Sequence, residues 1–228
     1  MAAVTLRAAW PENTGVTDMP QQPPTPRSWR LEDAEAVARA HPYTFYKPSA
    51  ERVAQLKPGN LAKVIFAFDT DDPRAPSAER MWLVIESVLD DRFVGRLDND
   101  PIYIADLNPG DRVEFEARHI IDTDLPGKED SPVERYGKRC FVSNRVLYDG
   151  AKVGYLYREE PVHNDDSGWR ITAGTEPEDY MDNADNVSYV SLGAVLNLDD
   201  RIVGLLDSPP GSEFGVDPAG GRFVPIED

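Results

Sequence analysis

The side chains that could perform acid–base or metal chemistry in this chain are carboxylates and three histidines. His41, His119 and His163 lie far apart in the sequence, and no Ser or Cys stands in a nucleophile motif such as G-x-S-x-G. Paired carboxylates act as acid and base only where a cleft gives the two groups different environments. We therefore expect that the protein is not an enzyme. A hydrolase that uses Asp or Glu is the third and most remote alternative. The acidic clusters are Asp69 with Asp71 and Asp72, Asp165 with Asp166, and Glu176 with Glu178, Asp179, Asp182 and Asp185.

A metal, phosphate or redox site has little support. His163 stands in an acidic loop with Asp165 and Asp166, but the spacing matches no ligand motif, including the EF-hand. The run G-V-D-P-A-G-G near the C-terminus lacks the Lys and the strand-to-helix context of a phosphate-binding loop. The single cysteine, Cys140, cannot form a disulfide within the chain, and we expect it to be buried at the start of a strand. We predict no cofactor and no metal.

Two of the acidic clusters surround aromatic side chains, which is the composition of a protein-binding surface. Aromatic anchors supply most of the binding energy in such a surface, and acidic side chains accelerate association with a basic partner. For Trp169 the alternative, a core position in a strand with Tyr180 as its neighbour, is the preferred interpretation. For the acidic loop, partner binding and simple solvation are equally compatible with the sequence. The candidate partner-binding residues are Asp165, Asp166, Trp169, Glu178, Asp179, Tyr180 and Asp182.

The charge of the chain is strongly negative and unevenly distributed. Its 228 residues hold 41 Asp and Glu against 24 Lys and Arg, a formal net charge of −17. Residues 141–228 hold 17 of the acids and 6 of the bases. The acidic second half would repel nucleic acid and anionic membranes and would attract a basic protein. For the net charge by itself, the simpler explanation is that acidic side chains keep a protein soluble. No apolar run suits a membrane span, and the first ten residues lack a signal-peptide pattern, so we expect a cytoplasmic protein.

The first half begins with a proline-rich arm and continues into helices and strands. Residues 13–27 hold four prolines among Gln and Thr, so we predict a disordered or extended arm over residues 1–30. Helices are predicted at 31–40 and 49–56, the second with Ser49 as N-cap. Between them, the aromatic rings of H-P-Y-T-F-Y-K-P could pack across the junction. Strand patterns follow at 61–68, 80–88, 93–97, 102–104 and 112–118. Their spacing favours a small, strongly bent antiparallel sheet or barrel in a domain of residues 31–125.

The second half follows a linker, which we place at residues 126–139. Between residues 142 and 157, two apolar and aromatic runs flank Asp149 and Gly150, and this pattern predicts a β-hairpin with a tight turn at Gly150. Further strands are predicted at 169–173 and 187–190, followed by a helix with Ser191 as N-cap and a second apolar stretch at 199–206. The chain is thus predicted to be an α+β protein of two domains, the second spanning residues 140–212, with a loosely ordered tail at 213–228.

Part of the second half resembles a known family. The resemblance lies in four runs: S-N-R-V-L-Y-D-G-A-K-V-G-Y-L-Y-R-E-E-P, D-S-G-W-R, E-D-Y-M-D-N-A-D-N and L-L-D-S-P-P-G-S. Over about residues 141–212 these runs are similar to immunity protein 33, an immunity-protein family of bacterial polymorphic toxin systems. The resemblance implies a protein that neutralises a cognate toxin. E-R-M-W-L-V-I, G-R-L-D-N-D-P and L-N-P-G-D-R-V-E-F resemble a second bacterial family, of unknown function, over about residues 60–122. That resemblance implies a fold unit and no activity.

These patterns predict a non-catalytic binding protein: an immunity protein that inhibits a basic toxin by stoichiometric binding through the acidic face of its second domain. The alternative is a housekeeping or regulatory module whose first domain recognises another cellular protein, because toxin inhibition does not require the additional β-rich half. The sequence indicates neither the oligomeric state nor the identity of the partner.

Overall fold

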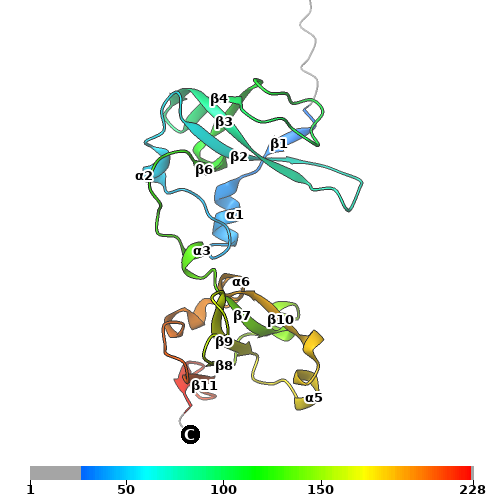
Figure 1. The fold of residues 1–228 in the computed structure, drawn as a ribbon, viewed down its shortest axis with the longest axis vertical. Coiled ribbons are helices and arrows are strands. Elements are labelled where there is room, and N and C mark those ends of the chain that lie inside the picture. The colour runs from blue at the N-terminus through cyan, green and yellow to red at the C-terminus, as the bar shows by residue number, and fades with distance from the viewer. Residues whose placement is uncertain (1–26, 227–228) are drawn as a thin grey trace, which may run out of the picture.

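The computed structural model describes residues 27–226 and places their strands in two six-stranded sheets, one above the other in Figure 1. Each sheet packs on a hydrophobic core of its own. Helices and strands are mixed along the chain, so the predicted α+β class is confirmed. Residues 1–26 of the predicted arm lie outside the described residues. Among the described residues, no helix is long and apolar enough to cross a membrane.

Sheet A is a nearly closed antiparallel barrel made by the first half of the chain. Its strands follow the order β1 (Trp29–Leu31), β2 (Leu61–Phe68), β3 (Ala78–Leu89), β4 (Arg92–Leu97) and β5 (Arg112–Glu116). The 3-10 turn η1 (Ala117–His119) then redirects the chain, so that β6 (Ile120–Thr123) pairs with β2. In β3 the buried side chains alternate at Met81, Leu83 and Ile85, as expected for a strand with one face on the core.

Most of the predicted strands of this half are confirmed, and the errors lie at its margins. Residues 102–104 form no strand and belong to the loop between β4 and β5. Residues 29–31 pair with β2 as β1, so α1 (Ala34–Ala40) begins three residues later than predicted, after the N-cap Asp33. Ser49 caps α2 (Ala50–Val53) as predicted, because its hydroxyl accepts a hydrogen bond from the Arg52 amide at 3.1 Å.

Sheet B is made by the second half of the chain and contains one parallel pair, β7 with β9. The helical segments α4 (Asn144–Leu147), α6 (Leu192–Leu196) and η3 (Asp200–Leu205) contribute buried residues to its core. The opposite face, which holds Phe141, Arg170 and Tyr157, belongs to no buried cluster. The strand order is β10 (Val187–Ser191), β7 (Arg139–Ser143), β9 (Asp166–Thr172), β8 (Tyr155–Arg158), β11 (Glu213–Val216) and β12 (Phe223–Pro225).

The predicted hairpin at residues 142–157 is wrong. The first run leaves β7 at Ser143, which caps the helical turn α4, and β9 lies between β7 and β8. Gly150 does have a positive φ of 75°, but the turn follows a helix and joins no paired strands. A hairpin exists one strand later, where β8 and β9 pair antiparallel. The strands at 169–173 and 187–190 and the cap at Ser191 are confirmed.

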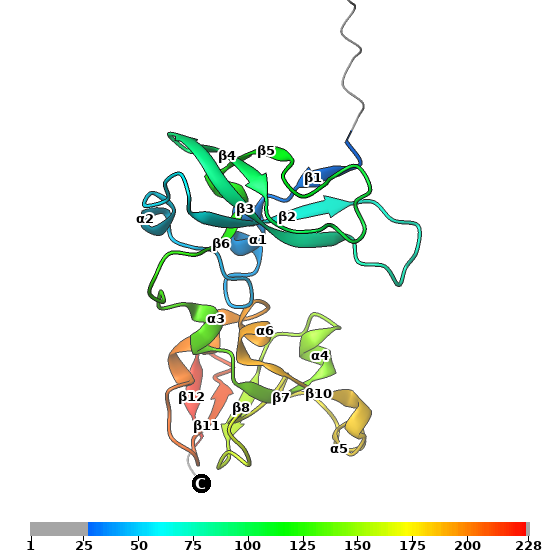
Figure 2. The ribbon, with the colours of Figure 1, turned by 45° about the horizontal axis from the view of Figure 1, so that its top comes forward.

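Two further corrections concern the linker and the tail. The linker region contains the helical turn α3 (Pro132–Arg135), whose following residue, Tyr136, is buried in the core of sheet B. The predicted loose tail forms β11 and β12, which extend sheet B beyond β8 and are seen at the lower left of Figure 2. In both stretches, Pro, Gly and acidic residues hide a short helix or strand whose stability comes from its neighbours.

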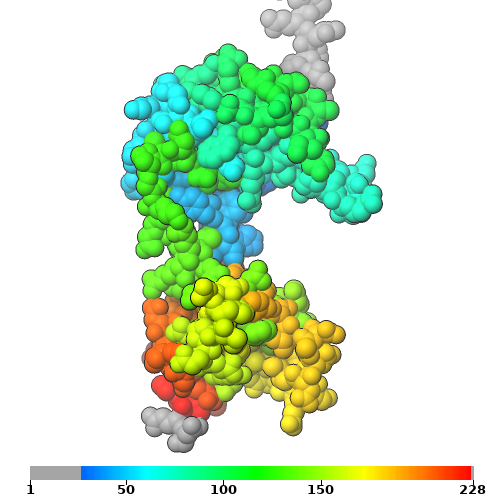
Figure 3. Space-filling model, in the orientation of Figure 1, coloured from blue at the N-terminus to red at the C-terminus, as the bar shows by residue number. Residues whose placement is uncertain are grey.

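The two halves meet at a narrow waist, visible in Figure 3. Tyr43, from the aromatic segment between α1 and α2, packs its ring edge-on against Tyr136 at 5.7 Å. Its backbone amide donates a hydrogen bond to the side chain of Asn197, which also donates one to the Thr44 hydroxyl. Tyr43 therefore packs on the second half and not, as predicted for the rings of this segment, across the junction of the two helices. The domain limits themselves stay a prediction.

Candidate partner-binding site

Trp169 is a core residue and not a surface anchor. Its side chain is fully buried in β9, its indole N–H donates a hydrogen bond to the Leu206 carbonyl at 3.3 Å, and its ring faces Phe214 at 6.3 Å. The preferred interpretation of Trp169 is therefore correct, and the partner-binding role predicted for it is wrong. A fully buried strand residue cannot reach a partner unless the sheet opens.

Asp166 is also unavailable to a partner, because it is an internal structural anion. Its carboxylate bonds to the Arg170 guanidinium at 3.2 and 3.3 Å and accepts the amide protons of Gly168 and Val162 at 2.9 and 3.2 Å. The hydrogen bond from Arg170 is the main reason that the pKa of Asp166 lies well below its ordinary value. Since the side chain is almost wholly buried, the predicted role of Asp166 in attracting a partner is a second error.

The other predicted residues are accessible, but they lie in two separate places. Asp165 is exposed beside His163, whose Nδ1 is 2.7 Å from its carboxylate. Glu178, Asp179 and Asp182 are exposed on and beside the helical turn α5 (Glu178–Met181), which protrudes at the lower right in Figure 1. Tyr180 is half-buried under the Arg145 guanidinium, which lies 4.8 Å from its ring.

A row of four side chains crosses the open face of sheet B between these two acidic places. The strand register places Tyr189 opposite Phe141, Phe141 opposite Arg170, and Arg170 opposite Tyr157. The rings of Phe141 and Tyr189 are 4.8 Å apart, and the Arg170 guanidinium lies 4.8 Å from the Phe141 ring. We call these four residues the aromatic row. Phe141 is 42% exposed although it sits in the middle of a strand, so the row presents apolar area to solvent.

The aromatic row is held in position by the charged groups around it. Arg170 is fixed by Asp166 on one side and by Glu159, at 2.8 Å, on the other. Arg139 and His163 both lie against the Tyr189 ring, at 5.5 and 5.9 Å from its centre. The Tyr189 hydroxyl is buried and has no hydrogen-bond partner among the described residues. Since these side chains are already ordered, they would lose little conformational entropy when a partner binds.

Sequence reasoning missed this row, although a signal for it was present. Residues 139–143 read R-C-F-V-S, and the burial of Cys140 and Val142 forces Phe141 to the opposite face. An outward-facing Phe with one Arg two residues before it in its strand and another Arg opposite it on the next strand is typical of a binding surface. The misplaced hairpin concealed the signal, because Arg170 and Tyr189 come from strands whose neighbours depend on the topology.

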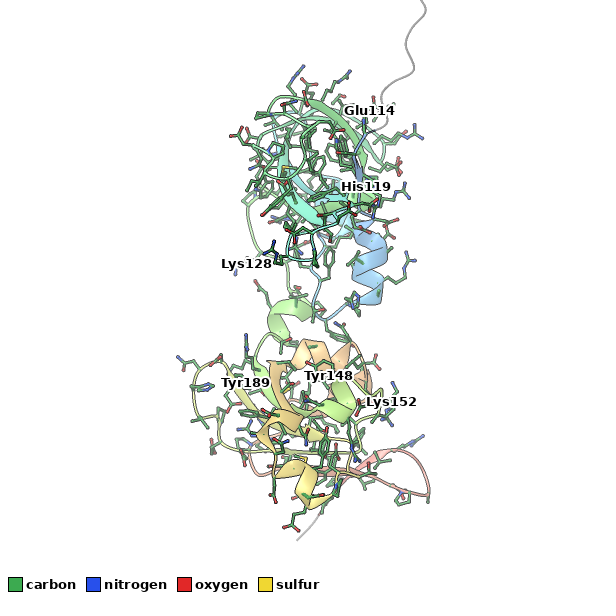
Figure 4. The ribbon with its side chains drawn as sticks, turned by 90° about the vertical axis from the view of Figure 1, so that its right-hand side faces the viewer. Glu114, His119, Lys128, Tyr148, Lys152 and Tyr189 are labelled. Carbon is green, nitrogen blue, oxygen red and sulfur yellow. The ribbon has the colours of Figure 1, made fainter. Side chains whose placement is uncertain are left out.

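The described residues contain no cluster of three or more His, Cys, Asp or Glu side chains that could hold a metal ion. His119 lies in the upper half of Figure 4, far from Tyr189 and therefore from His163, and its Nδ1 accepts the Glu116 amide proton at 2.9 Å. Burial lowers the pKa of His119 and raises that of Cys140 to about 12, so the thiol stays protonated and unreactive.

A cleft of about 500 Å³ lies where the barrel meets the linker, and its polar groups satisfy one another. The Tyr46 hydroxyl donates to Glu129 at 2.9 Å, and burial raises the pKa of Tyr46 to about 12. Arg52 donates to the Thr123 hydroxyl at 3.0 Å and to the carbonyls of Leu125 and Pro126. These bonds attach the linker to the barrel, so the cleft has a structural role.

Comparisons with curated proteins and with solved structures give no match for this chain. The resemblance of residues 60–122 to a second family therefore stays a prediction. A family model does match the second half, over more residues than the resemblance covered, because it includes β11 and β12. Residues 140–227 match the Immunity protein Imm33 domain, and the aromatic row and α5 both lie within the matched residues, apart from Arg139 beside the row.

Proposed function

We propose that this protein inhibits a cognate toxin by binding it stoichiometrically, without catalysis. The match of residues 140–227 to an immunity-protein domain is the observation that carries the proposal. It implies a protein partner, and the excess of acids over bases in this half favours a basic one. The described residues contain no side-chain cluster that could hold a catalytic metal ion.

The proposed contact surface is the aromatic row with an acidic group at each end of the sheet. Asp165 lies at the end where β7 begins, because its backbone carbonyl accepts the Arg139 amide proton. The α5 acids lie at the other end, where Asn144 bonds the Asp185 carbonyl at 2.8 Å. Aromatic rings and arginines contribute most of the energy at protein interfaces, and peripheral acids accelerate the encounter with a basic partner. This arrangement replaces the predicted surface centred on Trp169.

A second candidate function concerns the barrel. Sheet A lies outside the residues matched by the immunity-protein model and has a core of its own. Toxin inhibition by sheet B does not require it, so we keep the alternative that the barrel recognises another cellular protein.

The test begins with the full-length chain, tagged and used to capture partners from the native host, with mass spectrometry to identify them. Each captured protein is expressed alone to measure its toxicity and then co-expressed with the chain. A toxic partner that is rescued by the wild-type chain, at a one-to-one ratio in the purified complex, supports the proposal. If the captured proteins are harmless when expressed alone, the barrel-centred alternative takes its place.

A further inference from the structure

Sheet B ends on one side at β10, and part of the backbone of this strand faces outward there. Among the described strands, β10 pairs with β7 alone. The Leu192 amide donates a hydrogen bond to the Lys138 carbonyl at 2.8 Å, and bonded and non-bonded pairs alternate from there along an antiparallel ladder. The amides of Tyr189 and Ser191 therefore point away from the sheet.

The outward-facing groups of β10 are largely unused. The amides of Tyr189 and Ser191 have no hydrogen-bond acceptor among the described residues. The Tyr189 carbonyl accepts one hydrogen bond, at 3.3 Å from the Arg139 guanidinium, and keeps a second lone pair. Every residue of the strand is partly exposed. An exposed strand edge of this kind is a template for a strand of another chain.

The opposite end of the sheet lacks this opportunity. β12 is three residues long and ends in Pro225, which has no N–H to offer. Proteins commonly protect sheet edges with very short strands, prolines and charged side chains. β10 reads V-S-Y-V-S and carries neither a proline nor a charge. Of the two ends of sheet B, the β10 edge is therefore the one suited to pairing.

Acidic side chains lie at both ends of β10. At one end is the exposed Asp165, whose backbone carbonyl accepts the amide proton of Arg139, the register partner of Ser191. At the other end are Asp182 and Asp185, which are exposed and directly precede the strand. These charges repel a second copy of a chain whose net charge is −17, and they attract a strand with Lys or Arg near both of its ends.

We propose that the toxin adds a strand to sheet B along β10, through backbone hydrogen bonds to Tyr189 and Ser191. This inference rests on the proposed function and adds to it the mode of binding. The toxin segment is extended, matches the five residues of β10 and carries a basic side chain near each end. Residues opposite one another in a sheet point to the same face, so an apolar side chain opposite Tyr189 continues the aromatic row.

The first experiment measures hydrogen exchange of backbone amides in the full-length chain by NMR. The chain is measured free and saturated with the purified toxic protein that it captures from the native host. We expect the Tyr189 and Ser191 amides to exchange fast in the free chain and at least about 100-fold more slowly in the complex. The amides of Ser188 and Val190, which bond to β7, serve as the internal control and should be slow in both states.

A matched pair of variants separates the backbone of Tyr189 from its ring. Tyr189→Ala removes the ring alone, whereas Tyr189→Pro removes the ring and the outward-facing amide. Proline is tolerated at an edge position whose N–H faces solvent, so the ladder to β7 is kept. In isothermal titration, the proline variant should bind the toxin at least about fivefold more weakly than the alanine variant. Thermal unfolding checks that both are folded, and if the proline variant is not, hydrogen exchange in the wild type decides.

The outcomes distinguish this inference from the function on which it rests. Binding of the toxin without slower exchange at Tyr189 and Ser191, or equal affinities of the two folded variants, would overturn strand addition and leave the proposed function intact. A free chain that sediments as a dimer with both amides protected would also overturn it, because the occupant would then be a second copy. If no captured protein is toxic, the proposed function fails and this inference fails with it.

Discussion

The backbone carbonyl of Tyr43 occupies the space that a side chain on Gly193 would need. A Cβ built on Gly193 would come within 2.3 Å of the Tyr43 oxygen, and the Gly193 amide donates a hydrogen bond to the Tyr136 carbonyl at 3.0 Å. A segment of the first half thus lies directly against the first turn of α6, within the residues that match the immunity-protein model. This close contact explains why a glycine stands in L-G-A-V-L, because helix propensity alone would disfavour Gly at this position.

The first prediction follows from this contact. Gly193→Ala should destabilise the full-length chain by about 1–3 kcal/mol, because the new methyl group forces the backbone of the Tyr43 segment away from α6. Gly204→Ala is the matched control, since it lies in η3 and no atom comes within 4 Å of the added Cβ. Denaturant unfolding followed by circular dichroism measures both. Equal midpoints for the two variants would show that the Tyr43 contact contributes no stability.

Asp166 provides a prediction about pH. Asp166→Asn should lower the free energy of unfolding by roughly 3 kcal/mol at pH 7, because it leaves the buried Arg170 guanidinium without its main anion. The folded protein depresses the pKa of Asp166, so the carboxylate's contribution is present above its unfolded value of about 3.9 and is lost as pH falls toward the folded value. The difference between wild type and variant should therefore shrink below about pH 4. Asp165→Asn, at the exposed neighbouring position, should cost much less stability at pH 7. A constant gap between wild type and Asp166→Asn would contradict the assignment.

Truncation tests whether the residues after Ser212 stabilise sheet B or form a loosely ordered tail. Removing the residues after Ser212 deletes β11 and β12 and leaves Leu156 and Trp169 without Phe214. We expect a loss of at least about 3 kcal/mol, in the range measured when large apolar residues are removed from cores. Phe214→Ala alone should account for part of it, and Val224→Ala, at an exposed position, for little. If the thermal unfolding curves of the truncated and full-length chains coincide, these residues contribute no stability and the prediction of a loosely ordered tail is correct.

A fourth prediction concerns the acidic ends of the proposed surface. Reversing Asp179 and Asp182 to Lys should slow association with a basic toxin by about tenfold at low salt and weaken its salt dependence, since the long-range attraction is lost. Reversing Asp69 and Asp71 in the barrel changes the net charge equally and should slow association much less. Stopped-flow measurements at several ionic strengths compare the two pairs. An equal effect of both pairs would mean that total charge, and not the α5 face, guides the encounter.

The sequence correctly predicted the elements that depend only on residues close together in the chain. The strand at residues 61–68 and the hydroxyl caps at Ser49 and Ser191 depend on neighbours within a few positions, and the structure confirms them. The hairpin failed because V-S-N-R-V-L can continue as a strand or cap a helix at Ser143. The insertion of β9 beside β7 decides between these two, and that contact joins residues far apart in sequence.

The site was only partly predictable for the same reason. Asp165 and the α5 acids are exposed as expected, because short polar segments between strands lie on the surface. Asp166 could not be told from Asp165 in the sequence, since its burial depends on the turn at Gly168, which has a φ of 82°, and on Arg170. The aromatic row requires the order of four strands, which no sequence window contains.

The measurement that tests the central claim most directly is the affinity of the identified toxin for full-length chains altered in the aromatic row. Phe141→Ala and Tyr189→Ala remove the two contacting rings, and Leu89→Ala is the control, a 72% exposed apolar residue on the barrel. Isothermal titration should show each row variant binding at least about tenfold more weakly, a loss of about 1.4 kcal/mol, with a one-to-one ratio and unchanged thermal stability. Wild-type affinity in both folded row variants would contradict the account.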